Sequence, residues 1–188
     1  TATKPAVAAP PPPTAAPACN LGSVTLKEPD NGALRQTKEK RVGGDYFVIA
    51  QVHYHGGGDW YEDKTSMIRL QARAEKEFGV KASTARKVVQ LTDDNLFSYP
   101  MLFMTGHGNV DFSPDEAARL REYLDRGGFL WACDDYGMDE SFRREMKKVY
   151  PERPLVELPF SHEIYRNYYN FPNGPPKVHE HAGGPPRG

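Results

Sequence analysis

The sequence predicts an α/β fold with three layers, in which a mainly parallel sheet is flanked by helices. From residue 43 onward, short runs of β-branched, aromatic and aliphatic residues alternate with amphipathic segments of helical period. This alternation is typical of βαβ units, whose strands lie parallel. One run, Met101–Met104 (MLFM), is apolar at every position, as expected for a central strand that helices cover on both sides.

Residues 1–42 have a different composition and are expected to be a spacer and connector. Thr1–Pro17 consists almost entirely of Ala, Pro and Thr, so it has little to bury and favours extended conformations. The connector carries scattered apolar residues, and Ser23–Leu26 is its candidate for a short edge strand. We therefore place the ordered domain at residues 43–188.

Charge and hydropathy argue against nucleic acid as a partner and against a transmembrane segment, and the composition of the N-terminal part indicates a location. The net charge is −1, so no global charge favours nucleic acid, and no apolar run reaches the roughly 20 residues of a transmembrane segment. The chain does not start with Met, and an Ala/Pro spacer after a removed signal peptide is typical of an exported bacterial protein. We expect a periplasmic or extracellular location, with a trimmed fragment as the alternative.

The first half of the domain contains two predicted strands and one helix. Asp45–Tyr54 is the first strand, and His53 and His55 at its end share a face, either as half of a metal site or as polar exit residues. Lys64–Phe78 is a helix with Asp63 or Thr65 as N-cap and Gly79 as its stop. Its expected buried stripe is Met67, Leu70, Ala74 and Phe78. Lys87–Leu91 is the second strand.

The second half contains the helix with the clearest boundaries. Ser113, Pro114 and Glu116 form a capping box with Pro in the first turn, and Gly127 ends the helix. The fourth strand, Phe129–Ala132, leads into a loop at 133–137. A further helix is capped by Asp139, and Pro154–Leu158 is a candidate for another short strand.

The candidate site lies where two strands pass into polar loops, at 99–109 and 127–137. In an open α/β sheet, the loops at the carboxyl ends of neighbouring strands line the ligand crevice. Alternatively, Asp59 and Trp60 anchor their own loop, and His107 caps a loop without binding a ligand. The ligand-binding candidates are Gly57, Gly58, Asp59, Trp60, Gly106, His107, Gly108, Asp134, Asp135 and His162.

Three chemistries suit these residues. Cys133 could be a nucleophile with His162 as base and Glu163 orienting it, but the carboxylates beside the thiol would raise its pKa. A hydrolase could use Asp134, Asp135, His107 and His162 as ligands of a divalent metal, although no compact ligand motif such as HExxH is present. The third hypothesis, which we favour, is a domain without a cofactor that binds a small molecule or protein partner.

Several ordered motifs together resemble the DUF4159 family, a bacterial domain of unknown function. They are GGGDWY at 56–61, YPMLFMTGHG at 99–108, the Ser-Pro-Asp-Glu helix start, GGFLWACDDYG at 127–137 and the segment His162–Tyr165. The resemblance covers about residues 44–188. It implies a class I glutamine amidotransferase-like (flavodoxin-like) fold and a domain that continues beyond Gly188.

The same resemblance argues against amidotransferase chemistry. Amidotransferases of this fold place their nucleophile in a Gly-x-Cys-x-Gly elbow and use a His-x-Glu pair, whereas this chain has Ala-Cys-Asp-Asp and an adjacent His162-Glu163. By this resemblance, the family usually has an acidic residue at the cysteine position. This implies that the carboxylates of Asp134 and its neighbour are the family's common feature and that Cys133 is incidental. No amidotransferase activity is therefore expected.

Overall fold

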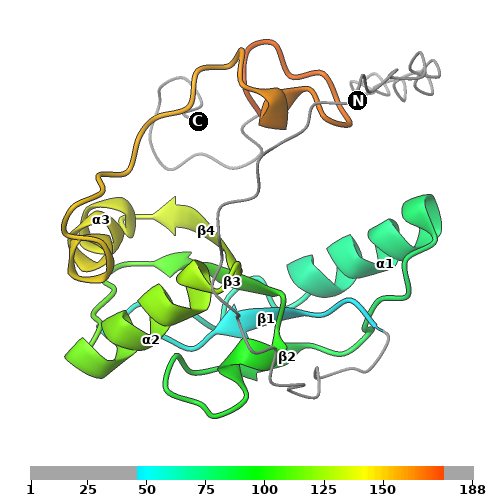
Figure 1. The fold of residues 1–188 in the computed structure, drawn as a ribbon. Helices are drawn as coiled ribbons and strands as arrows, with labels where there is room; N and C mark the ends of the chain where they lie inside the picture. The colour runs from blue at the N-terminus through cyan, green and yellow to red at the C-terminus, as the bar shows by residue number, and fades with distance from the viewer. Residues whose placement is uncertain (1–45, 176–188) are drawn as a thin grey trace, which may run out of the picture. The chain divides into compact units, whose positions relative to one another are not determined.

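The computed structural model describes residues 46–175, which lie in the second of the two units, 1–37 and 38–188, into which the chain divides (Figure 1). The predicted edge strand Ser23–Leu26 and Cys19 lie outside the described residues. Among the helices of residues 46–175, none combines the length and the apolar character needed to cross a bilayer.

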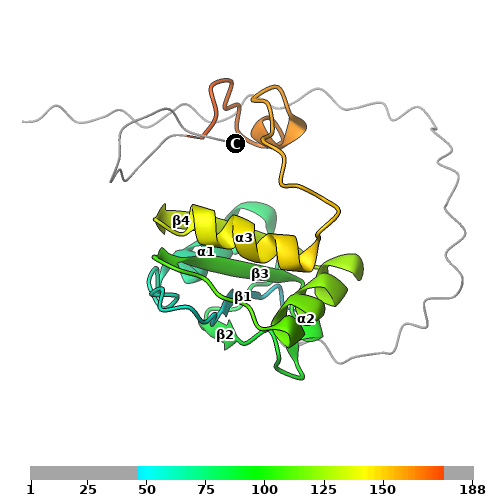
Figure 2. The ribbon, with the colours of Figure 1, turned by 90° about the vertical axis from the view of Figure 1, so that its left-hand side faces the viewer.

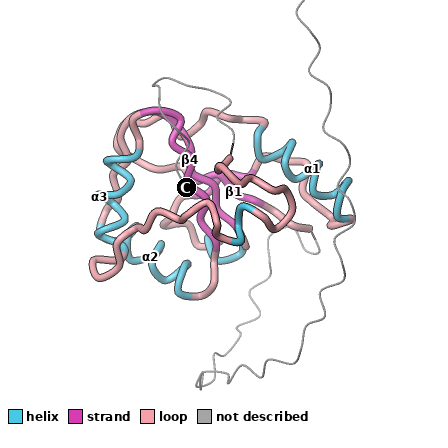
Figure 3. The backbone as a smooth tube through the Cα atoms, turned by 90° about the horizontal axis from the view of Figure 1, so that it is seen from above, coloured by secondary structure: helices cyan, strands magenta, loops and turns pink. Residues whose placement is uncertain are grey.

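The described residues form a parallel four-stranded sheet between helices. The strands are β1 (Ile49–Val52), β2 (Lys87–Val89), β3 (Met101–His107) and β4 (Phe129–Tyr136), in the order β2-β1-β3-β4. The α-helices are α1 (Ser66–Phe78), α2 (Pro114–Asp125) and α3 (Asp139–Val149), with short 3-10 helices at Leu96–Ser98 and Glu163–Tyr165. Helix α1 lies on one side of the strands, and α2 and α3 lie on the other (Figures 2 and 3). The three-layer α/β prediction is confirmed.

The two faces of the sheet are covered unequally. Helices α2 and α3 pack on each other and close the larger core. On the opposite face, α1 covers mainly β1 and buries only Met67 and Gln71, and the Gln71 side-chain oxygen accepts the backbone N–H of Ile49 at 3.0 Å. The predicted apolar stripe of α1 is therefore wrong at Leu70 and Phe78, which are exposed, because this helix faces only part of the sheet.

The capping box of α2 is confirmed atom by atom. The Ser113 hydroxyl accepts the Glu116 backbone N–H at 3.2 Å, and the Glu116 carboxylate accepts the Ser113 backbone N–H at 2.8 Å. Two of the orphan donors at the helix start are thereby satisfied. The buried face of the helix includes Ala117, Leu120 and Tyr123, as the spacing predicts.

Strand lengths differ from those expected at the carboxyl edge of the sheet. β3 continues through Gly106 to His107, and β4 continues through residues 133–136, which were expected to form a loop. Pairing with β3 extends β4, because Thr105 lies opposite Cys133 and Gly106 lies opposite Asp134. The register shifts between Gly106 and His107, which lie opposite Asp134 and Tyr136, so Asp135 is an additional residue in β4. The Asp134 side chain contacts the start of α3, whereas the Asp135 side chain contacts Thr105.

The start of α3 also differs from the prediction. Asp139 is the first residue of the helix, and its carboxylate accepts the Arg143 guanidinium at 2.7 Å. Asp134 caps the helix instead, accepting the backbone N–H groups of Met138 at 2.9 Å and Asp139 at 3.0 Å. The expected strand at Pro154–Leu158 is wrong for this conformation, since these residues have no regular structure.

Buried polar groups of α3 fix the loop that follows β3. The Glu145 carboxylate accepts the Phe112 backbone N–H at 2.8 Å, and the Ser141 hydroxyl accepts that of Val110 at 3.0 Å. Burial alone would raise the pKa of Glu145, but hydrogen bonds from Lys148, from Phe112 and from Arg144 hold it below its usual value. The loop next to His107 is therefore held rigidly by the helix behind it.

Candidate functional site

The glycine loop at 56–58 lies against the end of β3, as the sequence predicts for loops at one sheet edge. The Gly58 N–H donates to the Asn109 carbonyl at 3.0 Å, and the Asp59 N–H donates to the His107 carbonyl at 3.2 Å. A Cβ on Gly58 would lie 2.8 Å from the His107 carbonyl oxygen. The glycine at 58 thus lets two backbones approach closely, which is a packing role.

Asp59 and His107 form the polar centre of this edge. One Asp59 oxygen accepts the His107 backbone N–H, and the other lies 3.0 Å from the His107 Nδ1. Burial raises the pKa of Asp59, but the hydrogen bonds from the His107 backbone and ring outweigh it and leave the pKa below its ordinary value. A carboxylate on Nδ1 fixes the orientation of the imidazole, whose side chain is 41% exposed.

A second carboxylate pair shares one buried hydroxyl. The Thr105 Oγ1 lies 3.0 Å from Asp135 Oδ2 and 3.3 Å from Asp63 Oδ2, and Thr105 is fully buried. A hydroxyl has one proton, so it donates to only one carboxylate at a time. Burial raises the pKa of Asp135, and the negative charges of Asp63 and Asp59 raise it further, against the opposing effects of Thr105 and His107.

Tyr54 forms the buried floor beneath these groups. Its hydroxyl donates to the Thr105 carbonyl at 3.2 Å, and its side chain is almost fully buried. Burial, followed by the charges of Asp59, Asp135 and Asp134, raises the pKa of Tyr54 to about 12. We call Asp59, Asp63, Thr105, His107 and Asp135 the carboxyl-edge cluster.

Sequence reasoning missed two members of the cluster. Asp63 was considered only as a helix cap, and Thr105 only as the residue that follows the apolar run Met101–Met104. Asp63 has a left-handed backbone, with φ of 53°, which turns the chain into α1. The sequence gives no sign of this turn. Thr105 could have been noticed as a hydroxyl that directly follows four apolar strand residues.

The structure separates two of the predicted site residues, Asp134 and Trp60, from the cluster. Asp134 caps α3 on the opposite face, and the Trp60 ring stacks on His53 at 4.1 Å with the Arg86 guanidinium 5.7 Å from its centroid. The Trp60 carbonyl also accepts the Gln51 side-chain amide at 2.6 Å. These contacts favour the anchoring alternative for Trp60.

The geometry does not support a cysteine nucleophile. Cys133 packs against the small core of Ile49, Met67 and Phe103. Burial raises the pKa of its thiol, and the charges of Asp135, Asp63 and Asp134 raise it further. Within residues 46–175, no hydrogen bond joins Cys133 to His162, whose Nδ1 accepts the Ile164 backbone N–H at 3.2 Å instead.

A metal centre also finds no support in the part of the chain that the structure describes. No group of three or more His, Cys, Asp or Glu side chains within residues 46–175 is placed to hold a metal ion. His53 and His55 lie side by side, with ring centroids 5.5 Å apart. The Nε2 of His55 lies 3.9 Å from a Glu116 carboxylate oxygen, which is part of the α2 capping box.

Residues 48–188 match the model of a protein family described as a domain of unknown function, DUF4159. The chain belongs to the DUF4159 family. The matched region includes every residue of the carboxyl-edge cluster, and it confirms the family that the motifs resemble. A search of curated proteins finds no match to the chain. The DUF4159 description names no reaction, so function has to be argued from the site.

Proposed function

We propose that this DUF4159 domain binds a ligand, either a small molecule or a group on a protein partner, at the carboxyl edge of its sheet. The proposal also holds that the domain has no amidotransferase activity and acts outside the cytoplasm of a bacterial cell. The support for export is the Ala/Pro-rich composition of the spacer, which is typical of the segment that follows a removed signal peptide. The binding proposal rests on geometry.

The Asp59–His107 pair is the observation that carries the proposal. Asp59 holds both the backbone and the ring of His107, so this partly exposed side chain is fixed before any ligand arrives. Fixed polar side chains reduce the ordering cost of binding. They lie at the carboxyl ends of β1 and β3, where α/β sheets bind ligands.

The charge of the cluster indicates the class of ligand. Asp59 lies against the His107 ring, Asp63 and Asp135 share the Thr105 hydroxyl, and the negative charges of Asp63 and Asp59 contribute to the raised pKa of Asp135. A positively charged ligand would relieve this repulsion, whereas an anion would add to it. We therefore propose that the ligand presents an ammonium or similar cationic group.

The test compares probes of different charge by NMR. Ethylammonium, acetate and glycerol are titrated separately into the protein while the His107 ring resonances, assigned with His107→Gln, are followed. We expect ethylammonium to shift them more than the other two probes, and Asp135→Asn to weaken that shift. Asp94→Asn, which removes an exposed carboxylate on the loop after β2 that is not part of the cluster, is the matched control.

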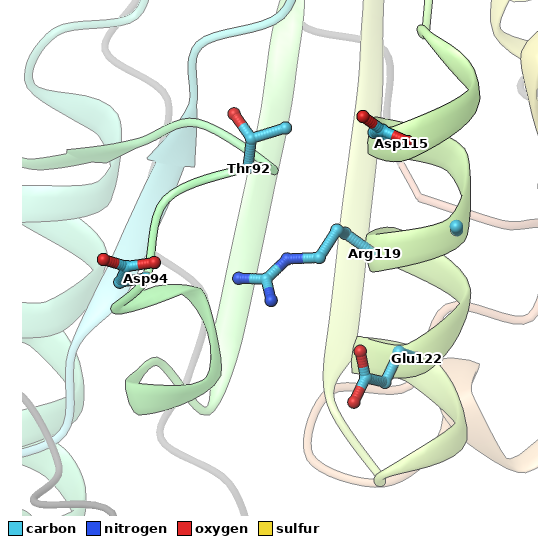
Figure 4. Close-up of a pocket in the computed structure, with 6 residues that line it drawn as sticks. Thr92, Asp94, Asp115, Arg119 and Glu122 are labelled. Carbon is cyan, nitrogen blue, oxygen red and sulfur yellow. The ribbon is translucent and has the colours of Figure 1, made fainter.

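Another location must be distinguished in the same experiment. A cavity of about 410 Å³ lies between α2 and the loop after β2, and it is lined by Thr92, Asp94, Asp115, Ala118, Arg119 and Glu122 (Figure 4). The guanidinium in this cavity, that of Arg119, already has protein partners. It donates to the Asp93 carbonyl at 2.8 Å and lies 4.7 Å from the Phe97 ring centroid. Probe shifts confined to this cavity would refute the proposed site.

A further inference from the structure

We propose that Asp63, Thr105 and Asp135 form a proton-binding site, and that a cationic ligand releases the proton when it binds to the carboxyl-edge cluster. We call these three residues the proton chain. The inference rests on the proposed function and deepens it, because it states how the occupancy of the same site depends on pH. The proton chain itself is present without any ligand, so it can be tested separately.

The Thr105 hydroxyl shows that the chain requires an additional proton. Its Oγ1 lies 3.0 Å from Asp135 Oδ2 and 3.3 Å from Asp63 Oδ2. A hydroxyl donates one hydrogen bond, and an ionised carboxylate can only accept. If both carboxyl groups were ionised, one of these two contacts would therefore bring two acceptor oxygens together without a hydrogen between them. A proton on one carboxyl group turns both contacts into hydrogen bonds.

The burial of Thr105 strengthens this argument. Thr105 is fully buried, so its hydroxyl has to find its partners within the protein. Buried polar atoms in native proteins are almost always hydrogen-bonded. With one added proton, the hydroxyl accepts from one carboxyl group and donates to the other, and both of its contacts are favourable.

Burial also assigns the added proton to Asp135. Asp135 is half-buried, whereas Asp63 is exposed to water, and burial disfavours the charged form of a carboxyl group. The pKa of Asp135 is accordingly raised, first by burial and then by the charges of Asp63 and Asp59, against the opposing effects of Thr105 and His107. The Asp135 carboxyl therefore donates to Thr105, and the Thr105 hydroxyl donates to the ionised Asp63.

Other titratable groups surround the chain, and their charges must be separated from that of Asp135. They come from β1, from the loop after it, from β3 and from β4, and they are Tyr54, Asp59, His107, Cys133 and Asp134. Tyr54 and Cys133 have raised pKa values and are neutral at pH 7, while the lowered pKa of Asp59 keeps that group ionised. Protonation of His107 is the change that has to be distinguished.

The proton and a cationic ligand compete for the same negative charge. The proton on Asp135 neutralises one of the three carboxylates of the cluster and so weakens the attraction for a cation. Because such coupling is reciprocal, a bound cation favours the loss of this proton. If one proton is fully displaced, the affinity for the cation falls about tenfold for each pH unit below the pKa of Asp135.

The first measurement uses the full chain without a ligand. The carbon NMR resonances of the aspartate carboxyl groups are followed against pH, with Asp135→Asn and Asp63→Asn providing the assignments. We expect Asp135 to titrate at higher pH than the exposed Asp94 and the Asp63 resonance to show the same step, since the two groups are coupled. Asp63→Asn should lower the midpoint of Asp135, and Asp94→Asn should leave it unchanged. Asn tolerates the positive φ at position 63, so the backbone is kept.

The second measurement adds the cationic probe. The affinity for ethylammonium, obtained from the His107 ring resonances, is determined over a range of pH for the wild type and for Asp135→Asn. Asn resembles the neutral carboxylic acid in size but takes up no proton. We expect the wild-type affinity to fall about tenfold per pH unit below the pKa of Asp135. Asp135→Asn should keep only the pH dependence that His107 causes.

The possible failures of the two proposals can be told apart. Titration of Asp135 together with Asp94, or a midpoint of Asp135 that Asp63→Asn leaves unchanged, overturns the proton chain. Equal pH dependence of ethylammonium binding in the wild type and in Asp135→Asn overturns the release of the proton by the ligand. If Asp135 titrates as expected and ethylammonium does not bind at any pH, the proton chain is supported and the proposed ligand class is wrong.

Discussion

Asp59 holds His107 at two points, through the backbone N–H and through the ring Nδ1 at 3.0 Å. The pair joins the glycine loop after β1 to the last residue of β3, so it sets both the shape of this edge and the direction of the imidazole. Substitutions at Asp59, Asp135 and Gly106 perturb this pair or the carboxylates next to it.

Asp59→Asn should destabilise the fold by about 1–3 kcal/mol, because hydrogen bonds to a partly buried charged group are lost or weakened. Hydrogen bonds from His107 hold the pKa of Asp59 below its ordinary value, so its carboxylate stabilises the fold above the unfolded pKa of about 3.9. That stability is lost as the pH falls through the lower, folded pKa. Urea denaturation at pH 7 and near pH 3 should show a larger wild-type advantage at the higher pH. An equal difference at both values would contradict the charge argument.

Asp135→Asn should have the opposite effect. Burial and the neighbouring carboxylates raise the pKa of Asp135, so the stability linked to its protonated form is present below the unfolded pKa of about 3.9 and is lost as pH rises. Removing the charge should therefore stabilise the protein at pH 7, by about 0.5–2 kcal/mol, and should make little difference near pH 3. Thermal unfolding at both pH values is the measurement. A loss of stability at pH 7 would show that the carboxylate is needed for structure.

Gly106→Ala should disturb the site more than Gly57→Ala, although both glycines have positive φ. A Cβ at 106 would lie 2.5 Å from the Tyr54 hydroxyl and 2.8 Å from an Asp59 oxygen, whereas a Cβ at 57 meets nothing within 4 Å. We expect Gly106→Ala to cost about 1–3 kcal/mol more than Gly57→Ala and to shift the His107 ring resonances. Equal effects would show that backbone strain alone matters at both positions.

The Cys133 thiol should react slowly with alkylating reagents. Burial and the charges of Asp135, Asp63 and Asp134 raise its pKa, so less thiolate is present at pH 8 than for an ordinary thiol. In the Cys19→Ser protein, alkylation by iodoacetamide should be slower than that of glutathione under the same conditions, and Asp135→Asn should accelerate it. Alkylation as fast as that of glutathione would reopen the nucleophile hypothesis.

Local sequence patterns predicted most of the fold. Three local patterns each predicted their structure from a few neighbouring residues and needed no tertiary information. They are the Ser113–Glu116 capping box, the helix end at Gly79 and the apolar run of β3. The errors came where distant segments decide the outcome. The apolar stripe of α1 was predicted at full width, but this helix covers mainly β1 and leaves Leu70 and Phe78 exposed.

By itself, the sequence determined the parallel α/β sheet, the DUF4159 resemblance and the edge at which glycine, histidine and carboxylate side chains gather. Only the tertiary structure decided which of these residues work together. Pairing with β3 extended β4 through the expected loop, and the extended strand places Asp135 beside Thr105 in the cluster and Asp134 at the start of α3. Strand pairing is a contact between residues far apart in sequence, so no local pattern could separate two adjacent aspartates.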